Sequence, residues 1–376
     1  MQGEVQEYGD RLIMQSFADL HLHAPQYPML GMGMDLPLMD WLHQYTFRTE
    51  SRFADTDYAR RVYRRLSRDL IENGTTRVAI FSSLHTESTW ILMEELENAG
   101  VTGYAGKVNM DRNALPGVLE ETTEESMRET LRWLDGCHFE HVHPILTPRF
   151  TPSCTDELMD FLGKLAQERN LPIQSHLSEC HGEIELMKQL YPECGYWESY
   201  QRHGLWRPGT LMVHCVYSDA TEREAMRQHG VTAVHCGDSN INICSGVCSV
   251  RRLLNEGNQV ALGSDIAGGA QLPMYRVITT TIRTSKVRTI MDDWQTNFLT
   301  VAEGYYLGTT AGHRWFGSGD GFAIGDRLHA IVVDDSTLPE PVRTLTLKER
   351  FERALYLMGR ENICTVWSDG RCVVNK

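Results

Sequence analysis

The chain has 376 residues, of which 41% are hydrophobic, so it is long enough to bury one large core or two ordinary ones. Its formal net charge of -14 at pH 7 argues against nonspecific binding to nucleic acid or to an anionic membrane surface, because such binding needs clustered Lys and Arg. No apolar run approaches the roughly 20 residues that span a bilayer, and the first residues are polar and acidic. We therefore expect a folded, cytoplasmic protein.

Short apolar runs alternate with amphipathic helical stretches along most of the chain. The predicted strands are 12–23, 77–84, 104–110, 141–146, 171–176, 211–214, 231–235 and 259–265. The predicted helices between them are 55–73, 90–98, one that starts at 122–125, 156–169, 183–190, 221–229 and 250–255. Eight strands that are separated by helices, most of them apolar on both faces, predict an α/β protein with a (β/α)8 TIM-like barrel. An open doubly wound sheet is the alternative, although no G-x-G-x-x-G follows the first strand.

The residues after the barrel predict a smaller β-rich part. A helical stretch at 300–316 is followed by predicted strands at 323–333 and 365–374, with a hairpin turn at 368–371. We predict a barrel domain over 12–316 and a reduced small β domain that is formed by 1–11 and 317–376.

His21 and His23 stand two residues apart at the end of the first predicted strand, so their rings project from one face. Taken alone, such a pair is more often a polar strand end than a metal site. Three further strand ends carry His176, His214 and Asp265. Each of these has an ordinary alternative as a core histidine or a helix cap, but their coincidence at the active end of a barrel favours a metal site. Imidazoles and a carboxylate suit Zn2+ or Fe2+, which activates a bound water molecule.

Glu179 follows His176 in the segment H-L-S-E. At the mouth of the fifth strand it can stand beside the metal-activated water without being a ligand, which is the position of a proton shuttle. Its alternative is a first-turn carboxylate of the next helix. His235, at the end of the seventh strand, is a weaker candidate for a partner of the ligands.

Several motifs make the sequence resemble the guanine deaminase branch of the metal-dependent amidohydrolase superfamily. The matching segments include D-L-H-L-H-A-P-Q-Y (19–27), T-P-R-F (147–150), Q-S-H-L-S-E (174–179), H-C-V-Y (214–217), S-N-I-N-I-C-S-G (239–246) and G-S-D-I-A-G-G (263–269). The resemblance implies one Zn2+ per chain, with Fe2+ as the alternative, and four ligands: His21, His23, His176 and Asp265. It also implies that Glu179, His214 and Asp265 are catalytic and that the purine contacts Gln26, Arg149, Phe150 and His214.

The resemblance implies hydrolysis of guanine to xanthine and ammonia by attack at C2, with Glu179 as the proton shuttle, in purine metabolism. The residues alone indicate only hydrolysis at an electrophilic carbon. The alternatives are an aminohydrolase that acts on another amino-substituted ring, such as a pterin, cytosine derivative or triazine, and a catalytically weak purine-binding paralogue. The expected partner is a small-molecule heterocycle, and a homodimer is expected by analogy with relatives.

Overall fold

The computed structural model describes residues 5–116, 119–317 and 322–376. Two four-stranded parallel sheets carry the predicted barrel strands. The first sheet holds β2 (Phe17–His23), β3 (Thr75–Phe81), β4 (Thr102–Gly106) and β6 (Val142–Pro144). The second holds β8 (Ile173–Leu177), β9 (Thr210–His214), β10 (Thr232–His235) and β11 (Gln259–Leu262). A short parallel pair, β5 (Val108–Asn109) and β7 (Thr147–Pro148), continues the strand ends between them.

Backbone contacts join the two parallel sheets at both edges. A parallel bridge between Leu146 and Ile173 links the segment after β6 to β8. At the other edge, the Asp265 amide donates to the His21 carbonyl oxygen at 2.8 Å and the His23 amide donates to that of Ile266 at 3.1 Å. The strands follow chain order within each sheet, which differs from the reversed order of a doubly wound fold. The predicted α/β class with a TIM-like barrel is confirmed.

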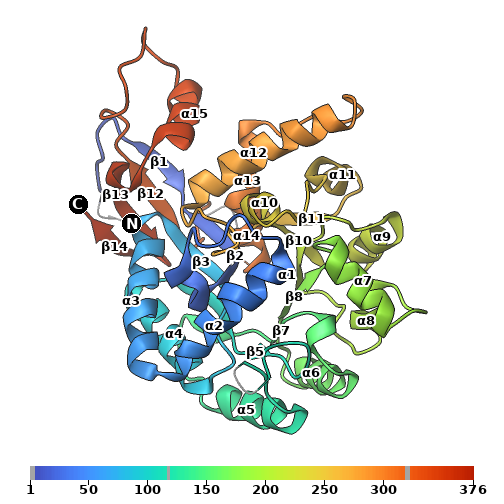
Figure 1. Ribbon diagram of the computed structural model, residues 1–376. Helices are drawn as coiled ribbons and strands as arrows, with labels where there is room; N and C mark the ends of the chain where they lie inside the picture. The colour runs from blue at the N-terminus through green and yellow to red at the C-terminus, as the bar shows by residue number, and fades with distance from the viewer. Residues whose placement is uncertain (1–4, 117–118, 318–321) are drawn as a thin grey trace.

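Helices surround the parallel strands (Figure 1). They are α3 (Thr56–Glu72), α4 (Thr86–Ala99), α5 (Thr123–Asp135), α6 (Asp156–Glu168), α7 (His181–Leu190), α8 (Tyr196–Gln201), α9 (Ala220–His229), α10 (Gly237–Asn242), α11 (Val250–Asn255), α12 (Met274–Met291), α13 (Val301–Gly308) and α14 (Thr310–Trp315). Helix α3 shows why they form: Asp55 caps its first turn, and Tyr63, Leu66 and Leu70 lie on its buried face. No helix in these described ranges is long and apolar enough to cross a membrane.

The segment between β2 and α3 folds into short helical turns. They are η1 (Ala24–Met29), α1 (Leu38–Trp41), η2 (Leu42–Thr46), α2 (Phe47–Glu50) and η3 (Ser51–Ala54). Trp41, Leu42 and Phe47 of this segment bury their side chains in a separate apolar cluster with Phe81 and Met110. We call residues 24–54 the covering segment. Its apolar side chains hold it in place by packing against Phe81 of β3 and against Met110.

A four-stranded sheet lies to one side of the barrel, next to α3 and α15 (Leu347–Leu357) (Figure 1). It contains β1 (Leu12–Gln15), β12 (Ala330–Val333), β13 (Ile363–Ser368) and β14 (Arg371–Asn375), in antiparallel order. The chain changes sheet after β1, because the Ser16 amide donates to His329 and the Phe17 amide donates to Gly74. The predicted first strand is thus two strands. The domain boundaries stay a prediction, and residues 1–4 and 318–321 of the predicted small domain lie outside the described residues.

Candidate active site

Four strands of the barrel deliver the predicted metal-type residues to one place. His21 and His23 end β2, His176 lies on β8, His214 ends β9, and Asp265 follows β11. All five are buried. His214 and Asp265 adopt left-handed backbone conformations, with φ of 75° and 47°. Such conformations are costly for residues other than glycine and cluster at functional sites, so the backbone here is shaped to aim these side chains.

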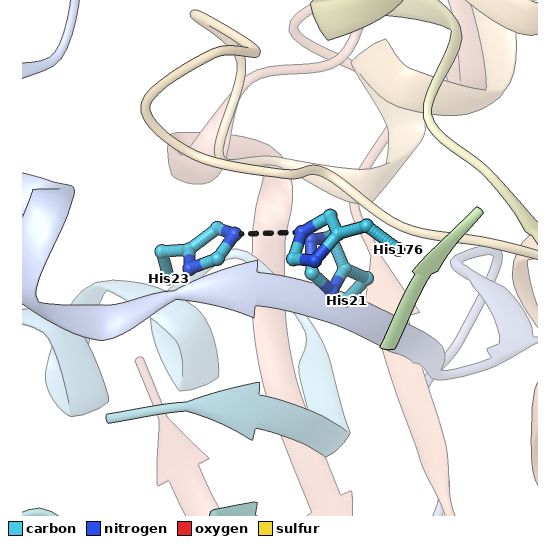
Figure 2. Close-up of side chains that lie close together, drawn as sticks. All are labelled: His21, His23 and His176. Atoms are coloured by element: carbon cyan, nitrogen blue, oxygen red, sulfur yellow. Dashed lines mark hydrogen bonds between the residues drawn. The ribbon is translucent and has the colours of Figure 1, made fainter. Parts of the chain in front are cut away.

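The ring nitrogens and one carboxylate oxygen converge. Nε2 of His23 lies 3.2 Å from Nε2 of His176, and Figure 2 shows these two rings facing each other beside His21. Oδ1 of Asp265 lies 3.2 Å from Nε2 of His21 and 3.6 Å from Nε2 of His23. Two overlapping groups, His21 with His23 and His176, and His21 with His214 and Asp265, each bring their ligand atoms within 4.8 Å of one another.

Hydrogen bonds behind the cluster fix which ring nitrogens carry a proton. Gln174 donates its amide to the Leu20 carbonyl oxygen at 2.6 Å, so its Oε1 faces Nδ1 of His21 at 3.1 Å and accepts from it. Nδ1 of His176 lies 2.6 Å from the Arg149 carbonyl oxygen and donates to it. In neutral rings, the proton on Nδ1 leaves a lone pair on Nε2.

Electrostatics keep the facing rings neutral. Burial, and next the electrostatic effect of the neighbouring His21 ring, hold the pKa of His23 and of His176 well below the ordinary value of 6.5. The Nε2 lone pair of His21 faces the Asp265 carboxylate, and the two repel unless a cation lies between them. Three imidazole nitrogens and one carboxylate oxygen are the mixed donor set that zinc takes in catalytic sites. The donor chemistry therefore fits a divalent cation.

His214 and Glu179 form the second part of the site. Nε2 of His214 lies 3.4 Å from Oε2 of Glu179 and 3.8 Å from Oδ2 of Asp265. Nδ1 of His214 lies 2.8 Å from Oδ1 of Asn240, and Ser245 donates to Oε1 of Glu179 at 2.8 Å. Burial, and next the charge of Asp265, raise the pKa of Glu179 to about 8. This carboxyl therefore holds a proton at neutral pH and can deliver it to a bound molecule.

A pocket opens over the cluster. Its lining includes Gln26, Arg149 and Phe150, the three residues predicted to contact a purine, together with Glu179, His214 and Asp265. Leu38, Trp41 and Leu42 of the covering segment form an apolar wall. A flat ring with a polar edge suits this combination of apolar walls and a few buried polar groups.

Every site residue predicted from the sequence lies in the cluster or in the pocket lining, apart from the weaker candidate His235. His235 is buried, and both of its ring nitrogens are without hydrogen-bond partners among the described residues. It belongs to neither group of potential metal ligands found in the described ranges. Four further residues take part in the site although no role was predicted for them: Glu50, Gln174, Asn240 and Ser245. Three of these stand within the matched motifs, whereas no signal in the sequence pointed to Glu50.

Comparisons with known proteins agree with this geometry. Residues 12–373 match the Amidohydrolase family. The guanine deaminase of Mus musculus is 36% identical over 375 residues, which cover 96% of this chain and 82% of that protein. The guanine deaminase of Escherichia coli strain K12 is 29% identical over 372 residues, with 98% and 82% covered. A crystal structure of guanine deaminase from C. acetobutylicum with bound guanine matches with a TM-score of 0.93 and 41% identity, and covers 97% of this chain and 87% of that one.

Proposed function

The chain belongs to the amidohydrolase family, and from this premise we propose that it deaminates guanine to xanthine and ammonia. The observation that carries the proposal is the 41% identity and near-complete overlap with a guanine deaminase whose active site holds guanine. The pocket adds support, since Gln26 and Arg149 place amide and guanidinium groups on the same lining as the His and Asp cluster.

Four residues would hold the metal ion in this proposal: His21, His23, His176 and Asp265. Zinc is the proposed ion because the donors are neutral imidazoles and a carboxylate. When bound, the ion acts as a Lewis acid that makes a water molecule nucleophilic at neutral pH. His214 would stand beside that water molecule, held by its hydrogen bond to Asn240.

The protein's own groups would bind the ring and move the protons. Gln26 and Arg149 would hydrogen-bond the polar edge of guanine, and Phe150 would stack on its face. Asp265 would accept a proton from the attacking water. Glu179 would deliver its proton to a ring nitrogen as the oxygen adds to C2. The C2–N bond would then break as Asp265 passes its proton to the leaving amino group, which departs as ammonia, while the proton on the new oxygen returns to Glu179. One water molecule is consumed, so the products are xanthine and ammonia.

Ammonia release from a panel of guanine, adenine, cytosine, a pterin and a triazine would test the proposal, with zinc-loaded protein and metal-stripped protein as its control. We expect release from guanine by the zinc-loaded protein alone. Release from another ring only would favour an aminohydrolase of different specificity. No release from any ring, with guanine still bound, would favour a purine-binding paralogue.

The homodimer expected by analogy with relatives and the cytoplasmic location expected from the sequence remain part of the proposal. The molar mass of the protein in solution would test the first. The location of the protein in fractionated cells would test the second.

A further inference from the structure

Glu50 is a buried carboxylate that lies behind the proposed purine pocket. It ends helix α2 in the covering segment, and 1% of its surface is exposed. Oε2 of Glu50 accepts from Nη1 of Arg149 at 2.8 Å, and Oε1 accepts from Nη2 at 3.2 Å. Oε1 also accepts from Nε2 of Gln26 at 2.8 Å. One carboxylate therefore contacts both of the polar side chains proposed to hydrogen-bond the purine edge, although it does not itself line the pocket.

These contacts fix the orientation of the Gln26 amide. Its Nε2 must face Glu50, because an ionised carboxylate only accepts hydrogen bonds. Its Oε1 accepts from the Ala267 amide at 3.0 Å, on the segment that follows Asp265. The amide is thus held at both ends, and one N–H of Gln26 is left for a ligand.

The same contacts determine what Arg149 can offer. A guanidinium has five N–H donors, and the paired contact with Glu50 takes two of them. The Phe47 ring, with its centroid 5.3 Å from the guanidinium carbon, supports another side of the group. Since 3% of Arg149 is exposed, its charge is compensated by Glu50 and not by solvent. Arg149 thus offers hydrogen-bond donors to the pocket while the Glu50–Arg149 pair as a whole carries no net charge.

Charge compensation matters because the proposed substrate and product differ in charge. Guanine is neutral at physiological pH, whereas xanthine loses a proton near neutral pH. An uncompensated guanidinium in a buried pocket would attract the xanthine anion and hold the product. A compensated one would favour a neutral ring that carries an oxo group.

We propose that Glu50 is a positioning and specificity residue, which acts through Gln26 and Arg149 to make the pocket select a neutral oxopurine over an anionic one. The inference rests on the proposed function and adds a discrimination against the product. Other titratable groups interact with the charges of Glu50 and Arg149. Burial raises the pKa of Tyr63 and lowers that of His85, and both groups also interact with the charge of Glu50. The charge of Arg149 acts on His23 and Glu179.

The test compares the zinc-loaded parent with Glu50→Gln in guanine turnover and in xanthine inhibition, below and above the pKa of xanthine. We expect the KM for guanine to rise about tenfold in Glu50→Gln, the effect of losing one oriented hydrogen bond, with little change in kcat. We also expect inhibition by xanthine to tighten with rising pH in Glu50→Gln relative to the parent. A purely structural role would not produce that pH-dependent difference.

Two further variants separate charge from geometry. Glu50→Asp keeps the charge but shortens the side chain, so its KM should rise without the tightening of xanthine inhibition. Glu95→Gln is the matched control. Like Glu50, Glu95 is a buried carboxylate that pairs with arginine, in its case with Arg60 and Arg64. It lies on α4, and neither Glu95 nor these arginines line the proposed purine pocket. It should leave both readouts unchanged.

Parent-like KM and parent-like xanthine inhibition in Glu50→Gln would overturn the inference. If Glu50→Gln does not fold, an unchanged KM in Glu50→Asp would overturn it. A parent that releases no ammonia from guanine contradicts the proposed function. If the parent does release ammonia from guanine and Glu50→Gln is indistinguishable from it, only the role of Glu50 is contradicted.

Discussion

The environment of Glu179 supports a role for this residue in proton transfer. It is 5% exposed, and its pKa of about 8 lies far above the ordinary 4.5 because of burial first and Asp265 second. Glu179→Gln keeps the size and the Ser245 contact but removes the transferable proton. We expect kcat for guanine to fall about 10²- to 10⁴-fold, the usual contribution of a general acid or base.

Steady-state ammonia release measures that effect. Glu185→Gln is the control, since Glu185 is an exposed glutamate on the following helix α7. A Glu179→Gln rate within tenfold of the parent would end the proton-shuttle role.

At the scale of residues, the sequence could indicate ligands but not their partners. His21 and His23 were predictable because their spacing is local and because strand ends share one rim of a barrel. Glu50 was not, since its contact with Arg149 joins residues 99 positions apart and no local pattern encodes it. Asn240 and Ser245 stood within a quoted motif, but their hydrogen bonds to His214 and Glu179 depend on the tertiary fold.

At the scale of elements, periodicity located all eight barrel strands, with small errors at their ends. Helix α12 was not predicted, although it has 18 residues. Its core is rich in β-branched residues, from Val277 to Ile282, which have low helix propensity and are typical of strands. Packing against α13 and α15 overrides that local preference.

A pair of helical glycines tests packing between elements. An added Cβ at Gly163 of α6 would lie 1.7 Å from the His203 carbonyl oxygen, whereas at Gly182 of α7 its nearest neighbours would be 3.8 Å away. Gly163→Ala should therefore cost about 1–3 kcal/mol of unfolding free energy, despite the better helix propensity of Ala. Gly182→Ala should be neutral or stabilising by up to about 1 kcal/mol. Denaturant unfolding of both variants decides, and equal stability would contradict the close packing.

Glu222, on helix α9, makes the unfolding free energy of the protein depend on pH. Burial raises its pKa from 4.5 to about 7, while Ser218 donates to its Oε1 at 2.5 Å. The folded state binds the Glu222 proton more tightly than the unfolded state. The resulting stabilisation of the folded state is therefore fully present below about pH 4.5 and is lost as pH rises through 7. Relative to Glu222→Gln, the parent should lose up to about 3 kcal/mol between pH 5 and pH 8.

Chemical denaturation at the two pH values measures the difference. Glu224→Gln is the control on the same helix. Arg227 lowers the pKa of Glu224 to about 2, so this group stays ionised across the interval in the folded state. A constant difference between Glu222→Gln and the parent would contradict the burial of a neutral Glu222.

At the scale of the whole molecule, metal binding should couple to stability because its ligands come from β2, β8 and the segment after β11. Zinc added to chelator-treated protein should raise Tm, with about 2.7 kcal/mol of stabilisation when the free ion exceeds its Kd a hundredfold. Scanning calorimetry tests this. His23→Ala should show a much smaller rise in Tm when zinc is added. An equal Tm of the parent with and without zinc would contradict the proposed metal site.

The side sheet joins the two ends of the described chain, since β1 pairs with β12 through registers such as Leu12 with Val333. During synthesis, β12 follows β1 by about 300 residues, and β13 and β14 come after β12. At typical synthesis rates, roughly tens of seconds separate the two. For that time β1 lacks its partner strand, so the nascent chain must be kept from aggregating until β12 emerges.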